Sequence, residues 1–302
     1  MISIIVCTYN RDKYIHQCLS NLANNTTSYS WEIILVNNNS TDNTHTECER
    51  FAKENPNVNF HYFIETTAGL SYARNRGMRE AHGDWFVFLD DDSMVGCDYV
   101  EQLGQLLDRF PDAGAFGGAI IPFFEDKTPK WLSKWSMGFV SAIDMGDAVV
   151  EFANGKYPIG ANMGISRQVI NKIGDFNTSL GRTKELLLGG EEKDIFARIR
   201  AAKYPIYYFP NITVKHCIPP RRTTYEFIQK LGYGVGVSEY LRTRSIGTLD
   251  YVKRLMQEVI KWGGTLVLWS GYFMSCQAPK GNVLVLFRYN VTKGLLCGMK
   301  YN

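Results

Sequence analysis

Three consecutive carboxylates, Asp90, Asp91 and Asp92, directly follow an apolar run at residues 85–89. Carboxylates this close cannot all ionise cheaply, so at least one would take a proton if nothing compensated the cluster. A divalent cation removes that problem, because Mg²⁺ and Mn²⁺ favour oxygen ligands and Mg²⁺ commonly shares carboxylates with substrate phosphates. A D-x-D pattern at a strand end therefore predicts a metal and diphosphate platform. The alternative is an acidic cluster at the start of a helix.

The apolar run before these acids belongs to a regular alternation of expected strands and helices. Runs rich in β-branched residues alternate with segments of helical periodicity, in order over residues 3–7, 12–24, 32–36, 42–53, 58–64, 69–81 and 85–89. This pattern predicts an α/β fold whose mainly parallel sheet is buried by helices on both faces. Ligands of such sheets bind outside the carboxyl ends of the strands, where we expect polar segments to meet at residues 8–11, 37–42 and 90–93.

The bulk composition is typical of a globular protein. The chain has 302 residues, of which 45% are hydrophobic and 21% are charged. This length allows one large domain, or one domain with a smaller appendage. Seven cysteines without a C-x-x-C pair predict reduced, intracellular thiols rather than a disulfide framework or a zinc site. The first ten residues indicate a strand rather than a signal peptide.

Charge and pattern change in the last quarter of the chain. From Glu226 onward, ten Lys and Arg residues stand against four acidic residues, and no alternating strands remain. Helices are expected over residues 225–240 and 251–262. No stretch approaches the roughly 20 apolar residues that a membrane-spanning helix needs. The basic and aromatic pattern favours either a helix lying in a membrane interface or a helical subdomain packed on the sheet, and the two do not exclude each other.

Five sequence motifs occur in a characteristic order: SIIVCTYNR, EIILVNNNSTD, GLSYARNRG, FVFLDDDS and GGEEKDIFARIR. Together they resemble the nucleotide-sugar glycosyltransferases of family 2, over roughly residues 1–220. The resemblance implies a GT-A (Rossmann-like) fold, with a glycosyltransferase domain at residues 1–222. Residues 223–302 are then a helical, basic and aromatic region, expected to face a membrane interface or to pack on the domain.

The resemblance implies residues that hold the nucleotide sugar. Around the base and ribose it places a group after the first strand, namely Thr8, Tyr9, Asn10 and Arg11. Asn38 stands where the family commonly has an aspartate that recognises uracil, so UDP-, dTDP- and GDP-sugars all stay open as donors. Arg74 is expected near the nucleotide, where it also orients the acids; a structural Arg–Asp bridge is the alternative.

The resemblance also implies a metal site and an acceptor site. Asp90, Asp92 and His216 are the expected ligands of Mn²⁺ or Mg²⁺, with Asp91 toward the ribose. Further residues are candidates for binding phosphate or acceptor, although each also suits a structural role: Trp131, Asp194, Arg221 and Arg222.

Members of this kind invert the anomeric centre, and a carboxylate at a helix start deprotonates the acceptor hydroxyl. The metal stabilises the departing diphosphate. Glu192 takes the position of this base, and Glu191 is the second candidate. The expected enzyme is a hexosyltransferase of cell-surface polysaccharide or glycoconjugate synthesis. Its acceptor is a glycan or a lipid-linked saccharide, at the inner, cytoplasmic face of a membrane, with no nucleic-acid partner.

Two other classes of protein share some of these features. A nucleotidyltransferase would show a Gly- and Lys-rich phosphate loop after its first strand, but the segment TYNRDKY has no glycine. A catalytically inactive module that only binds nucleotide sugars is disfavoured by the intact D-x-D and acidic pair.

Overall fold

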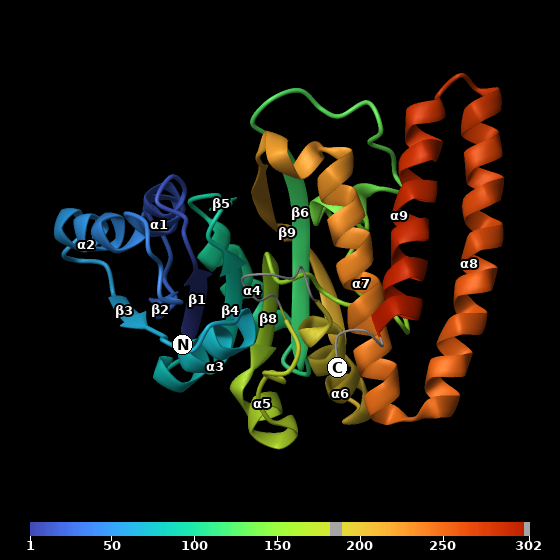
Figure 1. Ribbon diagram of the computed structural model, residues 1–302. Helices are drawn as coiled ribbons and strands as arrows, with labels where there is room; N and C mark the ends of the chain where they lie inside the picture. The colour runs from blue at the N-terminus through green and yellow to red at the C-terminus, as the bar shows by residue number, and fades with distance from the viewer. Residues whose placement is uncertain (182–188, 299–302) are drawn as a thin grey trace. The chain divides into compact units, whose positions relative to one another are not determined.

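The computed structural model describes residues 1–181 and 189–298 of the chain (Figure 1). The contacts divide the chain into two compact units. The first unit comprises residues 1–123, 141–179 and 191–217. The second comprises residues 124–140, 180–190 and 218–302.

The first unit is built around one mixed sheet in the strand order β3-β2-β1-β4-β8-β6-β9-β5, with β7 paired to β9. Its strands are β1 (Ile2–Thr8), β2 (Trp31–Asn37), β3 (Phe60–Ile64), β4 (Trp85–Asp90), β5 (Ser93–Val95), β6 (Ala115–Phe124), β7 (Val150–Glu151), β8 (Asn162–Ser166) and β9 (Ile206–Ile218). Strands β1 to β4 pair in parallel, whereas β8 pairs antiparallel with both β4 and β6. The parallel arrangement predicted from the alternation therefore holds for the first half of the sheet.

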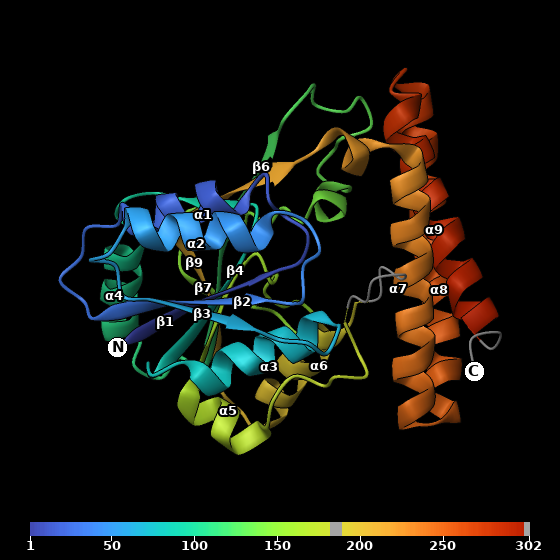
Figure 2. The same cartoon turned by 60° about the vertical axis from the view of Figure 1, so that its left-hand side comes forward.

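Helices cover both faces of this sheet (Figure 2). They are α1 (Ile15–Ala23), α2 (Thr44–Glu54), α3 (Leu70–Glu80), α4 (Tyr99–Arg109), α5 (Arg167–Ile173) and α6 (Glu191–Ala201). Side chains alternate across each strand, so Ile4 and Val87 join the core under α1, α2 and α4, while Ile5 and Phe88 join the core under α3, α5 and α6. The prediction that the apolar strands are buried on both sides is confirmed for β1, β2 and β4, whereas β3 is only partly buried and its Ile64 is exposed.

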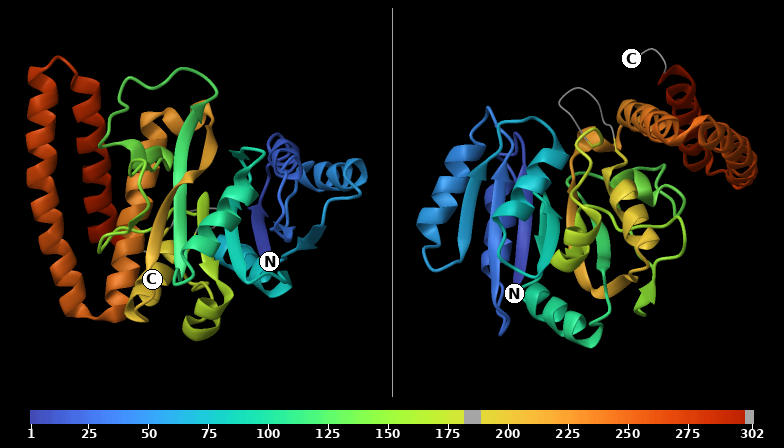
Figure 3. Two further views of the ribbon diagram at one scale, coloured as in Figure 1. Left: turned by 180° about the vertical axis from the view of Figure 1, so that it is seen from behind. Right: turned by 90° about the horizontal axis from the view of Figure 1, so that it is seen from below.

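The second unit contains three long helices, α7 (Tyr225–Ile246), α8 (Thr248–Met274) and α9 (Ala278–Cys297), and the short 3-10 helices η1 (Met137–Val140) and η2 (Pro220–Thr223). In Figure 3, α8 and α9 run side by side in orange and red. Glycines bring α7 and α9 close, because a Cβ at Gly236 would overlap the Val291 carbonyl and one at Gly294 would overlap the Tyr233 carbonyl. No helix within the described residues combines the length and apolar composition needed to cross a bilayer.

Candidate active site

The three strand-end acids lie where strand pairing brings a distant histidine to them. Asp90 is the last residue of β4, and β5 begins at Ser93. Because β5 pairs antiparallel with β9, Ser93 lies opposite His216. The His216 Nε2 atom lies 3.0 Å from Asp92 Oδ1 and 3.9 Å from Asp90 Oδ2. Candidate ligand atoms of these three residues all lie within 4.8 Å of one another.

The chemistry of this donor set fits a divalent cation. Two carboxylates and one imidazole supply oxygen and nitrogen ligands that suit Mg²⁺ or Mn²⁺. His216 is fully buried and Asp92 almost so, whereas Asp90 remains partly accessible. A cation held here would therefore meet a substrate on the Asp90 side.

Arg11 partly compensates the acids from the first strand-end loop. Its Nε atom lies 3.2 Å from Asp91 Oδ1, and its Nη2 atom lies 3.4 Å from Asp92 Oδ2. Burial raises the pKa of Asp91 to about 7, the Arg11 charge opposes that rise, and the neighbouring Asp92 and Asp90 add to it. Burial and the two neighbouring carboxylates thus outweigh the charge of Arg11 at Asp91.

A second acidic group stands at the start of α6. Arg74, on α3, places its Nη1 atom 3.1 Å from Glu191 Oε1 and its Nη2 atom 3.3 Å from Glu192 Oε1. The Arg74 guanidinium is buried over the rings of Phe176 and Phe88, at 5.3 and 5.9 Å from their centroids. The side chain of Glu192 is 22% exposed and that of Glu191 is 5% exposed. Glu192 is therefore the acid of this pair that a substrate reaches more easily.

Arg74 also connects the acidic pair to the strand-end acids. Burial lowers the pKa of Arg74, but the carboxylates of Glu192, Glu191 and Asp90 together raise it above the usual value. The charge of the Arg74 guanidinium thus interacts with the carboxylates of both acidic groups, which are about 100 residues apart in the sequence. Arg74 therefore forms its direct ion pairs with two glutamates, whereas the sequence analysis offered an Arg–Asp bridge as the alternative.

Gly160 is a site residue that the sequence analysis missed. Its backbone N–H donates to Glu192 Oε1 over 2.9 Å. A Cβ at this position would overlap Arg74 Nη2 and Glu192 Oε1, so only glycine leaves room for the pair. In the sequence Gly160 is only one glycine two residues before β8, and a lone glycine by itself indicates no more than a close approach of the backbone.

The two other strand-end loops are tied to each other. Asn10, whose φ of 54° is left-handed, accepts a hydrogen bond from the Thr41 N–H through Oδ1 over 2.8 Å. Asn38 donates to the carbonyls of Glu65 and Thr67 and accepts from the Gly69 N–H. The Asn38 amide thus anchors the loop before α3, and its expected role in reading a base stays a prediction.

Thr8 is buried at the end of β1 and Tyr9 is half-buried beyond it, so both stay at the strand end as expected. Asp194 binds Arg198 on its own helix over 2.9 Å. Arg198 in turn donates to the carbonyls of Ile173, Gly174 and Asp175. This favours a structural role for Asp194.

Three acceptor-site candidates belong to the second unit. Trp131 is buried and donates through Nε1 to the Thr223 carbonyl over 2.9 Å. Arg222, in η2, is buried with its guanidinium 5.8 Å from the centroid of the Phe227 ring, and Arg221 is exposed. Both Trp131 and Arg222 therefore take part in the packing of that unit, and their roles toward phosphate or acceptor stay predictions.

Known proteins resemble this chain over most of its length. The glucosyl-dolichyl phosphate glucuronosyltransferase of Haloferax volcanii is 24% identical over 79% of this chain and 76% of its own length. The succinoglycan biosynthesis protein ExoM of Rhizobium meliloti is 25% identical over 78% of this chain and 72% of its own length. A solved structure of the mannosyltransferase PcManGT from Pyrobaculum calidifontis, with GDP-Man and Mn²⁺, matches 97% of this chain and 86% of that one, with a TM-score of 0.63 and 17% identity. That likeness shows the GT-A fold, which confirms the expected fold class.

Other relatives match only one segment. Glycosyltransferase GlyA of Streptococcus pneumoniae is 35% identical, but the match covers 34% of this chain and 14% of that protein. The family model described as glycosyl transferase family 2 matches residues 3–174, more than half of the chain. These residues contain β1 to β4 and the three strand-end acids. The chain therefore belongs to glycosyltransferase family 2, a family of nucleotide-sugar transferases, and is a glycosyltransferase.

Proposed function

We propose that this enzyme is an inverting, metal-dependent glycosyltransferase that moves a sugar from a nucleoside diphosphate to a hydroxyl of a glycan or a lipid-linked saccharide. The observation that carries the proposal is Arg74, which contacts Glu191 and Glu192 directly and feels the charge of Asp90. A group that can accept a proton thus contacts a guanidinium whose pKa is also raised by an acid of the diphosphate platform.

Asp90, Asp92 and His216 would hold the cation, which is Mn²⁺ or Mg²⁺. A bound divalent cation neutralises the charge that develops on a departing diphosphate. Arg11 supports the same acids from the other side and keeps Asp91 in place. We assign Asp91 to the ribose and Thr8, Tyr9, Asn10, Arg11 and Asn38 to the nucleotide.

Glu192 is the proposed catalytic base, and Glu191 remains the second candidate. The acceptor oxygen forms a bond with the anomeric carbon while the bond from that carbon to the diphosphate breaks on the opposite face. The hydroxyl proton goes to the carboxylate of Glu192. Arg74 and the Gly160 N–H fix the orientation of this carboxylate. The greater exposure of Glu192 supports the choice over Glu191.

The relatives suggest a class of donor and a class of acceptor for this enzyme. The structure of PcManGT holds GDP-Man, so GDP-sugars join UDP- and dTDP-sugars as donors to test. The name of the Haloferax relative contains a dolichyl phosphate sugar, which supports a lipid-linked acceptor here. Arg221 and Arg222 are then candidates for binding a phosphate of donor or acceptor, and Trp131 is a candidate for binding the acceptor, whereas the ion pair with Arg198 favours a structural role for Asp194.

An enzyme whose acceptor is linked to a lipid must act at a membrane surface. We assign residues 1–222 to the transferase domain and residues 223–302 to a helical region that meets the membrane surface from the cytoplasmic side. The excess of basic residues after Glu226 supports this assignment, because the cytoplasmic leaflet carries anionic lipids.

The direct test is nucleotide release from a panel of UDP-, dTDP- and GDP-sugars with Mn²⁺, with Mg²⁺ and with EDTA. We expect release with one class of donor, loss with EDTA, and a product of inverted anomeric configuration by NMR. Undiminished turnover in EDTA would contradict the metal. Pyrophosphate release from nucleoside triphosphates would favour a nucleotidyltransferase, and donor binding without turnover would favour an inactive binding module.

A further inference from the structure

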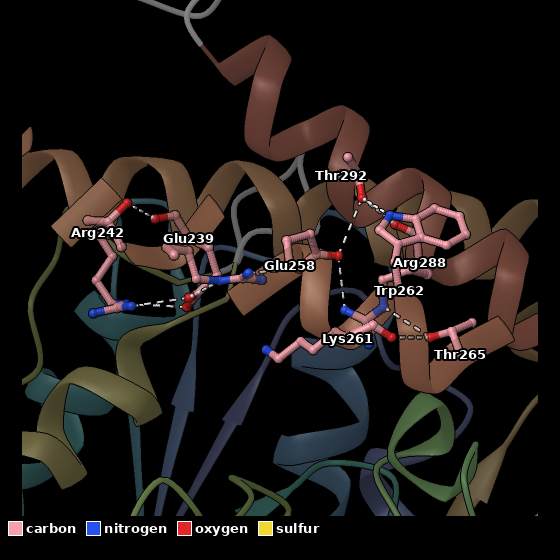
Figure 4. A network of polar contacts seen from close by, with 10 residues as sticks. Glu239, Arg242, Glu258, Lys261, Trp262, Thr265, Arg288 and Thr292 are labelled. Atoms are coloured by element: carbon pink, nitrogen blue, oxygen red, sulfur yellow. Dashed lines mark hydrogen bonds and ion pairs between the residues drawn. The ribbon is translucent and has the colours of Figure 1, made fainter. Parts of the chain in front are cut away.

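The helical unit has charge on its inside. Arg254, on α8, places Nε 3.0 Å from Glu239 Oε2 on α7 and Nη1 2.7 Å from Glu258 Oε2. Arg288, on α9, places Nη1 3.1 Å from Glu258 Oε1 (Figure 4). Arg254, Glu239 and Glu258 are all buried. These four residues form a charged seam that joins all three helices.

The opposite face of α8 is apolar and exposed. We call this face the α8 stripe; its most exposed members include Leu249, Met256, Ile260, Val267 and Met274. Leu249, Ile260 and Met274 are 75%, 76% and 78% exposed. The spacings of 7, 4, 7 and 7 residues place these five side chains on one side of a helix. On α8, therefore, charged side chains face the other helices and apolar side chains face outward, although apolar residues such as Val237, Val283 and Leu295 are buried between α7 and α9.

The α8 stripe is too wide to be a simple helix-pairing seam. Val252, Val259, Leu266 and Phe273 are also exposed and extend it beside the five residues above. In a coiled coil, two positions of each heptad are apolar and the flanking positions are often charged. Here the flanking positions hold Ile260, Val267 and Met274, while the central row contains Gly263 and Ser270. This pattern suits a broad apolar surface better than a second helix.

The charge around the stripe favours an anionic surface. Beyond Glu258, α8 and α9 contain no acidic residue, but they contain Lys261, Lys280 and Lys293 in addition to Arg288, which pairs with Glu258 in the seam. Two copies of such a region would repel each other, whereas an anionic bilayer attracts it. Because α8 is not apolar enough to cross a bilayer, it can only lie along one. Its 27 residues would cover about 40 Å of surface.

We propose that the α8 stripe inserts into the interface of an anionic bilayer, with α8 parallel to the membrane plane and the charged seam facing away from lipid. The proposal rests on the membrane-surface part of the proposed function and names the face responsible. Vesicle binding needs no donor, acceptor or turnover, so it is measured separately from catalysis.

The test is flotation of the full chain with vesicles of phosphatidylcholine, with and without phosphatidylglycerol. We expect binding to vesicles with phosphatidylglycerol, weakened but not abolished by high salt. Replacing both Ile260 and Val267 by Glu should reduce the partition coefficient between vesicle and water by at least about tenfold. The reason is that two aliphatic side chains that the bilayer would bury are lost. The matched control is Tyr225→Glu, an exposed residue in the first turn of α7, where an acid suits the helix dipole.

Circular dichroism of both variants checks that the helices form. We expect them to form, because the substituted side chains are exposed. Equal vesicle binding by wild type and the Ile260→Glu/Val267→Glu variant would overturn the proposal, as would the absence of wild-type binding. A wild-type dimer in sedimentation that becomes a monomer in this variant, with vesicle binding unchanged, would identify the stripe as a subunit interface instead. If a variant no longer binds vesicles but still hydrolyses the donor, the result would support the membrane role of the α8 stripe. If the protein binds vesicles but hydrolyses no donor, the result would contradict the proposed transferase function and leave the membrane proposal intact.

Discussion

The two units of this protein bury charge in different ways. In the first unit three carboxylates, Asp90, Asp91 and Asp92, meet at the carboxyl ends of strands, and Arg11 forms ion pairs with two of them. In the second unit Arg254 and Arg288 form ion pairs with Glu239 and Glu258 along a seam between helices, so positive and negative charges are equal in number. Three carboxylates crowded at one place are stabilised when a divalent cation binds to them. A seam of directly paired ions compensates itself and holds helices together, and it leaves the outer face free to be apolar.

The largest expected effect is a loss of turnover when the acidic pair at the start of α6 is changed. Glu192→Gln should lower turnover by about 10²- to 10⁴-fold, because an amide cannot accept the acceptor proton. Nucleotide release measures this loss. Glu191→Gln is the matched comparison and should cost less turnover; a larger loss there, in a protein that still melts like wild type, would move the base to Glu191.

The seam of the second unit should respond in stability instead. Glu258→Gln leaves Arg254 and Arg288 without their shared carboxylate, and breaking a buried pair costs about 3–5 kcal/mol. Urea unfolding followed by the helical signal measures it. The control is Glu226→Gln, whose exposed pair with Lys230 should leave the midpoint unchanged. Equal midpoints for the two variants would show that the seam does not hold the helices.

The strand-end acids should respond in metal affinity. Asp92→Asn removes a charged oxygen ligand, and we expect Mn²⁺ binding by titration calorimetry to weaken by about 100-fold or more, since even residues behind the ligands contribute 10- to 100-fold. Asp194→Asn makes the same chemical change on α6, where Arg198 holds the carboxylate, and should leave the affinity unchanged. A comparable loss in both would remove the distinction between them.

The smallest effect concerns the space around the acidic pair. Gly160→Ala places a methyl group against Arg74 and Glu192 and should lower turnover by about 10- to 100-fold through misplacement of the carboxylate. Gly138→Ala, where an added Cβ meets no atom within 4 Å, is the control. Wild-type turnover in Gly160→Ala would show that the orientation of Glu192 does not limit the reaction.

Much of the first unit could be predicted from local patterns. The strands β1 to β4, and the burial of β1, β2 and β4, follow from apolar runs that alternate with helical periodicity. The helices of the second unit were also expected, but α7 and α8 extend well beyond residues 240 and 262. An apolar pattern over residues 251–262 was expected as well, but which side chains of α8 face outward was not, because the seam that turns the charged residues inward joins three separate helices.

The sequence by itself determined which acids stand at a strand end, which acids begin a helix, and that the family is one of nucleotide-sugar transferases. These are local features, set by residue type and by spacing within a few turns. Only the tertiary structure decided that His216 lies 3.0 Å from Asp92, that Arg74 pairs with Glu191 and Glu192, and that Gly160 makes room for these side chains. The physical reason is that such contacts depend on strand order and register, which bring together residues about 100 positions apart.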